Sequence, residues 1–222
     1  MNEITVVILM VLLIACSDSG QGGRADIISF AKNGDLAGVA ASIDSDKRAI
    51  FAVDDKGNTA VVWAILNGHN EVAKHIISAG YPINPRAEGE FPLIMACTSR
   101  YTAASTEMLT FLLENRANPN VRYAPEGWYA LNMAVNNGME DKVRILVEHG
   151  AVMTNRDRSG ETPIELAQNR VKRFSDPGYD LPHGELSDPK VRRQTVERWE
   201  SMVELLRTLQ EGASKQSMQR NP

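Results

Sequence analysis

Residues 56–84 read KGNTAVVWAILNGHNEVAKHIISAGYPIN, and residues 126–154 read EGWYALNMAVNNGMEDKVRILVEHGAVMT. The two stretches align without a gap. In the first, Gly57 precedes Ala64 by seven residues, Gly68 follows four residues later, and Gly80 follows after twelve more. The second stretch has the same residue types at the same spacing. Self-similarity at a fixed period indicates stacked structural repeats, so we predict an array of short helical units.

The same spacing recurs elsewhere in the chain. An alanine again follows seven residues after Gly89 and after Gly160. Residues 26–43 lack the first half of a unit but place Gly34 at the mid-unit glycine, as is expected of a capping repeat. The alignment therefore predicts about five units within residues 25–210.

Each unit has the features of a helix–turn–helix pair. Thr162-Pro163 and its substitutes start the first helix, because proline fits the first turn, where no N–H is needed. The mid-unit glycine ends that helix in a left-handed conformation. The small alanines let neighbouring helices approach, and the following Val, Ile and Leu residues form the buried stripe of the second helix. The pattern resembles the ankyrin repeat, which implies an all-α solenoid of about five helix-turn-helix units with short hairpin fingers between them.

Three segments depart from the repeat. Residues 99–105 add length within the third unit and are predicted to form an extended turn between helices. Residues 171–194 separate a first helix from a second one predicted at 196–209, and their prolines and glycines exclude a continuous helix. Long loops in compact repeats are usually functional or disordered, and we favour a functional loop that contacts a partner. Residues 211–222 are polar and are expected to form a disordered tail.

The N-terminal region suggests export. Residues 4–14 are apolar apart from Thr5, a run too short for the ~20 residues that span a bilayer but suited to the core of a signal peptide. The next four residues, Leu13-Ile14-Ala15-Cys16, resemble a bacterial lipobox. That resemblance implies a signal peptide over 1–15, a lipidated Cys16 and a flexible tether over 16–24.

Two features qualify the lipobox. The first residues, MNE, carry no Lys or Arg, so an N-terminal apolar helix or strand is the alternative. Ser17 is not the Asp that resembles an inner-membrane retention signal, which favours the periplasmic face of the outer membrane. A lipidated Cys16 cannot form a disulfide with Cys97, so we expect Cys97 to be a buried, unreactive thiol.

The composition argues against several classes of function. The net charge is −4, and 24 basic and 28 acidic residues are spread along the chain, so nucleic acid is not an expected partner. The histidines have no cysteine or carboxylate at metal-ligand spacing, and no nucleophile elbow or phosphate-binding loop is present. We therefore predict no enzymatic activity, metal or cofactor. A hydrolase site built from Asp176, Asp180, His183 and Glu185 is the remaining alternative.

Aromatic and arginine residues gather in the turns between units, and such residues make effective interface anchors. By the ankyrin resemblance these turns edge the binding face, whereas Lys74 and Lys142 on second helices are expected to face away from it. The predicted partner contacts are Tyr81, Arg86, Arg122, Tyr123, Trp128, Arg156 and Arg158, with Phe174, Tyr179 and His183 from the insertion.

These features together predict a membrane-anchored periplasmic protein that binds another protein. Lipoproteins of this build resemble immunity proteins for secreted antibacterial toxins, such as the phospholipase effectors of type VI secretion. That resemblance implies a toxin as the partner and occlusion of its active site as the mechanism. An envelope adaptor or stress-protection lipoprotein is the alternative.

Overall fold

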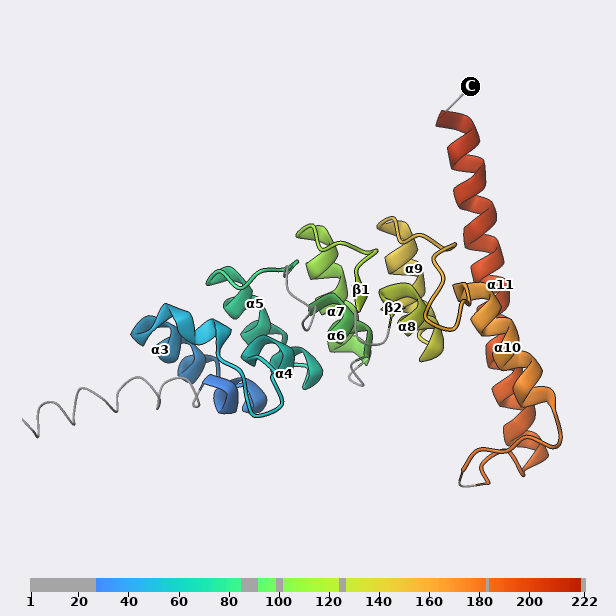
Figure 1. Cartoon of the computed structure of the whole chain (residues 1–222), viewed down its shortest axis with the longest axis horizontal. Helices are drawn as coiled ribbons and strands as arrows, with labels where there is room; N and C mark the ends of the chain where they lie inside the picture. Colours follow the sequence, from blue (N-terminus) through green and yellow to red (C-terminus); the bar gives the residue numbers. More distant parts are fainter. Residues whose placement is uncertain (1–26, 85–91, 99–101, 124–126, 183, 221–222) are drawn as a thin grey trace, which may run out of the picture. The chain divides into compact units, whose positions relative to one another are not determined.

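The computed structural model describes residues 27–84, 92–98, 102–123, 127–182 and 184–220. The signal peptide, Cys16, Arg86 and His183 lie outside these residues. Within the described part, the regular structure is helical apart from one two-stranded hairpin and an isolated bridge between Val53 and Thr59. The all-α architecture expected from the repeat is thus confirmed (Figure 1). No helix in these residues is both long and apolar enough to cross a bilayer.

The chain forms two compact units, and the first comprises the described residues up to Ile83 with the start of α7 through Met108. A helix over 27–33 is followed by α3 (Leu36–Ser45), the 3-10 helix η1 (Lys47–Phe51), α4 (Ala60–Leu66) and α5 (Asn70–Ser78). The side chains of His69 and Asn67 reach back to the carbonyl oxygen of Lys32, at 3.1 and 2.9 Å. These contacts join the second helix pair of this unit to the first.

The second unit comprises Asn84, α6 and the chain from Leu109 onward. Its elements are α6 (Pro92–Thr98), the end of α7 (Thr102–Glu114), β1 (Arg122–Tyr123), β2 (Trp128–Tyr129), α8 (Ala130–Asn136), α9 (Glu140–Glu148), α10 (Pro163–Ser175) and α11 (Pro189–Arg220). α11 packs against α10 and α9. The apolar side chains of Trp199, Met202 and Leu206 are buried there and close this end of the core.

The repeat signature has the predicted structural consequences. The alanines at 64, 96, 134 and 167 are fully buried. α4 and α8 each end before a glycine with positive φ, 78° at Gly68 and 65° at Gly138. α10 begins with Pro163 after Thr162, whose hydroxyl forms a reciprocal capping box with Glu165. The described residues contain five helix pairs, as the spacing predicts.

Three expectations about the irregular segments are wrong. α7 begins at Thr102, so the extra residues lengthen the second helix rather than the turn before it. α10 continues through Ser175 and α11 begins at Pro189, which leaves 176–188 as the loop of the insertion. α11 continues to Arg220, so residues 211–220 are helical. The Glu, Ala, Lys and Gln residues there are good helix formers, which accounts for a helix without an apolar face.

Lys142 also departs from the expectation, because its side chain is fully buried. In the repeat alignment Lys142 occupies the position of Val72, which is also buried, and not the position of Lys74. Lys74 is partly exposed and pairs with Glu71 and Glu107 at 2.9 and 2.6 Å. The aligned positions of the two lysines differ by two residues, and side chains two residues apart on a helix point about 200° apart. The two lysines therefore face opposite ways.

Cys97 is buried as predicted, with no exposed surface. Desolvation raises the pKa of its thiol to about 12, although the nearby charge of Lys142 acts in the opposite direction. A thiol with this pKa stays protonated near neutral pH, and the thiolate is the reactive form. Cys97 therefore acts as a small apolar core residue.

Candidate protein-binding surface

The hairpin of β1 and β2 forms one finger of the second unit. Arg122 pairs with Tyr129 and Tyr123 pairs with Trp128, and the N–H of Gly127 donates to the carbonyl oxygen of Tyr123 at 2.7 Å. The Arg122 side chain is exposed, and the three aromatic side chains are half-buried. Backbone pairing thus holds four side chains of the type that anchors interfaces in a fixed arrangement.

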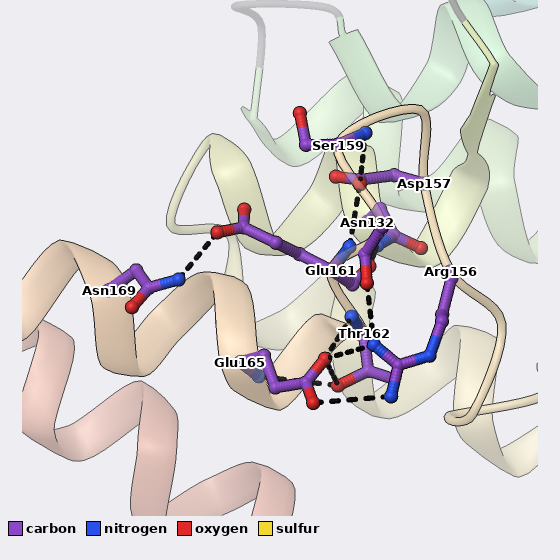
Figure 2. A network of polar contacts seen from close by, with 9 residues as sticks. Asn132, Arg156, Asp157, Ser159, Glu161, Thr162, Glu165 and Asn169 are labelled. Carbon is purple, nitrogen blue, oxygen red and sulfur yellow. Dashed lines mark hydrogen bonds and ion pairs between the residues drawn. The ribbon is translucent and has the colours of Figure 1, made fainter.

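The next finger is held by Asp157, as Figure 2 shows. One carboxylate oxygen of Asp157 accepts hydrogen bonds from the N–H groups of Ser159 and Glu161, at 2.8 and 3.0 Å. The side chain of Asn132 on α8 donates to the carbonyl oxygen of Glu161 at 3.2 Å. These bonds fix a tight turn with Arg158 and Ser159 exposed on it.

Asp54 organises the corresponding turn of the first unit. Its carboxylate accepts from the N–H groups of Lys56 and Asn58, each at 2.9 Å, and from the indole N–H of Trp63 at 2.8 Å. Desolvation alone would raise the pKa of Asp54, but these hydrogen bonds outweigh it and hold that pKa well below its usual range. The same turn chemistry therefore builds fingers in both units.

Arg156 is already engaged within the protein. Its guanidinium pairs with Glu165 at 2.8 Å and donates to the carbonyl oxygen of Gly160 at 2.5 Å (Figure 2). Hydrogen bonds from Thr162, followed by that from Arg156, hold the pKa of Glu165 below its usual value. Arg156 thus braces the base of the finger although it is exposed, and among the described residues the exposed Arg158 forms no ion pair.

Two predicted contact residues are core residues instead. Tyr81 is 8% exposed, with its ring 6.0 Å from that of Phe51. Phe174 is 6% exposed, with its ring 5.9 Å from that of Tyr179 and 6.3 Å from that of Trp199. A buried ring cannot reach a partner without local unfolding. The prediction of both residues as contacts is wrong, because in each case the fold supplies an aromatic neighbour from another segment.

The loop of the insertion is held by its own polar contacts. Asp180 accepts from the N–H groups of Leu181 and Leu186, each at 2.8 Å, and from the hydroxyl of Ser187. The Ser187 hydrogen bond is the main cause that keeps the pKa of Asp180 below its usual range. Asp180, a candidate for the alternative hydrolase site, thus has a structural role, and Tyr179 is the half-buried contact candidate of this loop.

Other surface features were not anticipated from the sequence. Phe51 at the end of η1 and Val53 just after it are 55% and 57% exposed in the first unit. Arg170 and Arg173 lie on the part of α10 that extends beyond the length of the other first helices. The helix-forming sequence after Ala167 could have indicated this extension. Among the described residues, no group of three or more His, Cys, Asp or Glu could hold a metal ion.

Comparison with known proteins identifies the repeat. A family model described as ankyrin repeats (3 copies) matches residues 12–123 and 101–174. Protein PhlB of Serratia liquefaciens is 31% identical over 137 residues, which are 60% of this chain and 57% of that protein. A putative ankyrin repeat-containing protein of Treponema pallidum is 28% identical over 124 residues, 56% of this chain and 39% of that protein.

A relative with a different overall function shows what the similarity covers. The Drosophila melanogaster tyrosine-protein kinase Shark is 26% identical over 176 residues, 76% of this chain but 18% of the kinase. The chain thus spans between 18% and 57% of the length of these three relatives, and the kinase shares only the repeats with it. The chain therefore belongs to the ankyrin-repeat family, and its repeats form a protein–protein interaction module.

Proposed function

We propose that this chain is a lipid-anchored periplasmic protein that neutralises a secreted antibacterial toxin by covering the toxin's active site. Two features support the proposal. The segment Leu13-Ile14-Ala15-Cys16 has the form of a lipobox, which would place the protein where an incoming toxin acts. The fingers of the second unit offer a surface suited to binding another protein. The lipoprotein resemblance further suggests the specific hypothesis that this toxin is a phospholipase.

One observation is the main support for the binding function. Exposed arginines lie beside half-buried aromatic rings, on finger turns that hydrogen bonds hold in place. Arg122 stands on the β1–β2 hairpin with Trp128, and Arg158 stands on the Asp157 turn. Because backbone hydrogen bonds already fix these turns, little conformational entropy is lost when a partner binds them. Arginine and tryptophan are also enriched among the residues that dominate binding energy.

A protection assay in bacteria tests this function. The chain is expressed in cells that receive a candidate phospholipase toxin in the periplasm, and survival and direct binding are measured together. We expect Arg122→Ala combined with Arg158→Ala to weaken binding about tenfold or more and to reduce protection. Arg144→Ala is the matched control, because Arg144 is an exposed arginine on the second helix α9.

Anchoring is tested separately. Cys16→Ser should leave binding in vitro unchanged but move the protein from the membrane fraction to the soluble periplasmic fraction. Membrane fractionation identical to that of the wild type would contradict the lipidation. Toxin sensitivity that the wild-type chain does not change would contradict the immunity role, and specific binding to a resident envelope protein would then favour the adaptor alternative.

A further inference from the structure

A hollow of about 280 Å³ opens beside Trp128 in the second unit. Its lining includes Trp128 of β2, Asn136 of α8 and Ser159 of the last finger, together with Arg170 and Arg173 of α10. Each wall comes from a different element, so the hollow is a property of the folded repeats rather than of one loop. Its lining combines an indole ring with two guanidinium groups.

The arginines owe their place to the length of α10. α4, α6 and α8 each have 7 residues, whereas α10 has 13, and Arg170 and Arg173 lie in its second half. Residues three apart on a helix share a face. Arg170 donates to the side-chain oxygen of Asn136 and lies 5.9 Å from the centre of the Trp199 ring. Arg173 lies 5.7 Å from the centre of the Tyr179 ring.

The two positive charges are only partly balanced within the hollow. Burial, and next the nearby charge of Arg173, lower the pKa of the Arg170 guanidinium, whereas the charges of Tyr179 and Glu161 act in the opposite direction. Glu161 lines the hollow, and one of its carboxylate oxygens accepts from the side chain of Asn169 at 2.5 Å. Two guanidinium groups thus face one carboxylate, and the lining has an excess of positive charge.

A second pair of arginines lies around Gly127, the residue before Trp128. A Cβ atom at Gly127 would lie 3.0 Å from a terminal nitrogen of Arg122 and 3.2 Å from the Cβ of Arg158. Both side chains are exposed. Within the described residues neither they nor the arginines of α10 form an ion pair. This local excess of positive charge contrasts with the net charge of −4 for the whole chain.

We propose that the hollow and the two finger arginines beside Trp128 bind the carboxylate side chains of an acidic segment of the partner protein. Guanidinium groups bind carboxylates through two parallel hydrogen bonds, and the indole ring of Trp128 can pack on the methylene groups of a glutamate. A like-charged partner would be repelled, so the patch also contributes to the choice of partner. This inference rests on the proposed protein-binding function and names the chemistry of its partner.

The experiment uses hexaglutamate as the probe and the indole N–H signals of the three tryptophans as reporters in two-dimensional NMR spectra of the full chain. We expect hexaglutamate to shift the signal of Trp128 and to leave that of Trp63 unchanged, and hexalysine to shift neither. Arg170→Gln with Arg173→Gln should weaken the hexaglutamate titration about tenfold or more. The matched control, Arg144→Gln with Arg193→Gln, removes two exposed arginines away from the hollow and should leave the titration unchanged.

Three outcomes would overturn the inference. The first is no shift of the Trp128 signal, and the second is an equal titration in the Arg170 and Arg173 variant. The third is a shift of the Trp128 signal by inorganic phosphate, at the same total charge, that equals the shift by hexaglutamate. That result would identify a general anion site. None of these outcomes affects the proposed function, because protection by the chain and its loss in the finger variants are measured with the candidate toxin.

Discussion

The buried ammonium group of Lys142 donates a 2.7 Å hydrogen bond to the backbone oxygen of Ala96. The side chain has no exposed surface, and desolvation lowers its pKa, with the nearby Cys97 acting in the opposite direction. The unfolded chain, with an ordinary lysine pKa of 10.5, therefore binds a proton more readily than the folded protein does. Lowering the pH through this range thus favours unfolding.

The first prediction follows from this linkage. The free energy of unfolding of the wild type should increase relative to that of Lys142→Met as the pH rises from neutral toward 10.5, by at most ~1.4 kcal/mol per pH unit. Urea denaturation of both proteins across this range measures the difference, and both carry Cys97→Ala because the charges of Lys142 and Cys97 influence each other. A difference that does not change with pH would show that Lys142 has its ordinary pKa in the folded state.

Arg116 provides a test of the repeat register. It is the one non-glycine residue with positive φ in the described part of the chain, at 67°, and it occupies the position of Gly80 and Gly150 in the alignment. We expect Arg116→Gly to raise the free energy of unfolding by about 0.5 kcal/mol, because relief of left-handed strain exceeds the entropy that glycine adds to the unfolded state. Gly150→Ala, the reverse change, should lower it. Loss of stability in Arg116→Gly, measured by urea denaturation, would contradict this argument.

Most of the fold could be predicted because each repeat position has a strict physical requirement. An alanine between packed helices and a glycine at positive φ admit few substitutes, so their spacing located the helix pairs. The contact surface was harder to predict, since the sequence does not show which segment covers a given ring. Tyr81 follows the turn at Gly80 and Phe174 lies among charged and polar residues, yet Phe51 and Trp199 pack against them.

Phe174 gives a prediction that separates folding from binding. Because its ring is buried against Trp199 and Tyr179, Phe174→Ala should lower the free energy of unfolding by about 3 kcal/mol. Binding should then weaken only under conditions where the variant is partly unfolded. Arg158→Ala should behave in the opposite way, with weaker binding and an unchanged melting temperature. Thermal melting and binding measured on the same samples distinguish the two; a Phe174→Ala variant that melts normally would restore Phe174 as a contact residue.

Asn120 joins two successive repeats through its side-chain amide. The oxygen accepts from the N–H of Val152 at 2.8 Å, and the nitrogen donates to the carbonyl oxygen of Gly150 at 3.0 Å. Asn84 makes the same pair of bonds to Asn118 and Arg116 one repeat earlier. We expect Asn120→Ala to lower the free energy of unfolding by about 1–2 kcal/mol, since two hydrogen bonds are lost. Asn115→Ala, which removes a single bond to the end of α7, is the control for denaturation experiments and should have a smaller effect.

Arg192 holds the loop of the insertion against the end of α10. Its guanidinium donates to the carbonyl oxygens of Phe174, Asp176 and Tyr179 at 3.1, 2.7 and 2.9 Å. The end of a helix leaves carbonyl groups without partners, and a cation there also interacts favourably with the helix dipole. Arg192 thus satisfies acceptors that the chain reversal between α10 and α11 would otherwise leave to solvent.

Removal of this side chain should loosen the loop and leave the rest of the fold in place. In Arg192→Gln we expect backbone amides over 176–188 to exchange with deuterium about tenfold faster, which corresponds to ~1.4 kcal/mol of lost local stability. Amides of α8 and α9 should keep their wild-type rates. Arg193→Gln removes a neighbouring exposed arginine and should leave the exchange of the loop unchanged. Equal exchange in the two variants, measured by mass spectrometry, would mean that Asp180 and its partners are sufficient to hold the loop without Arg192.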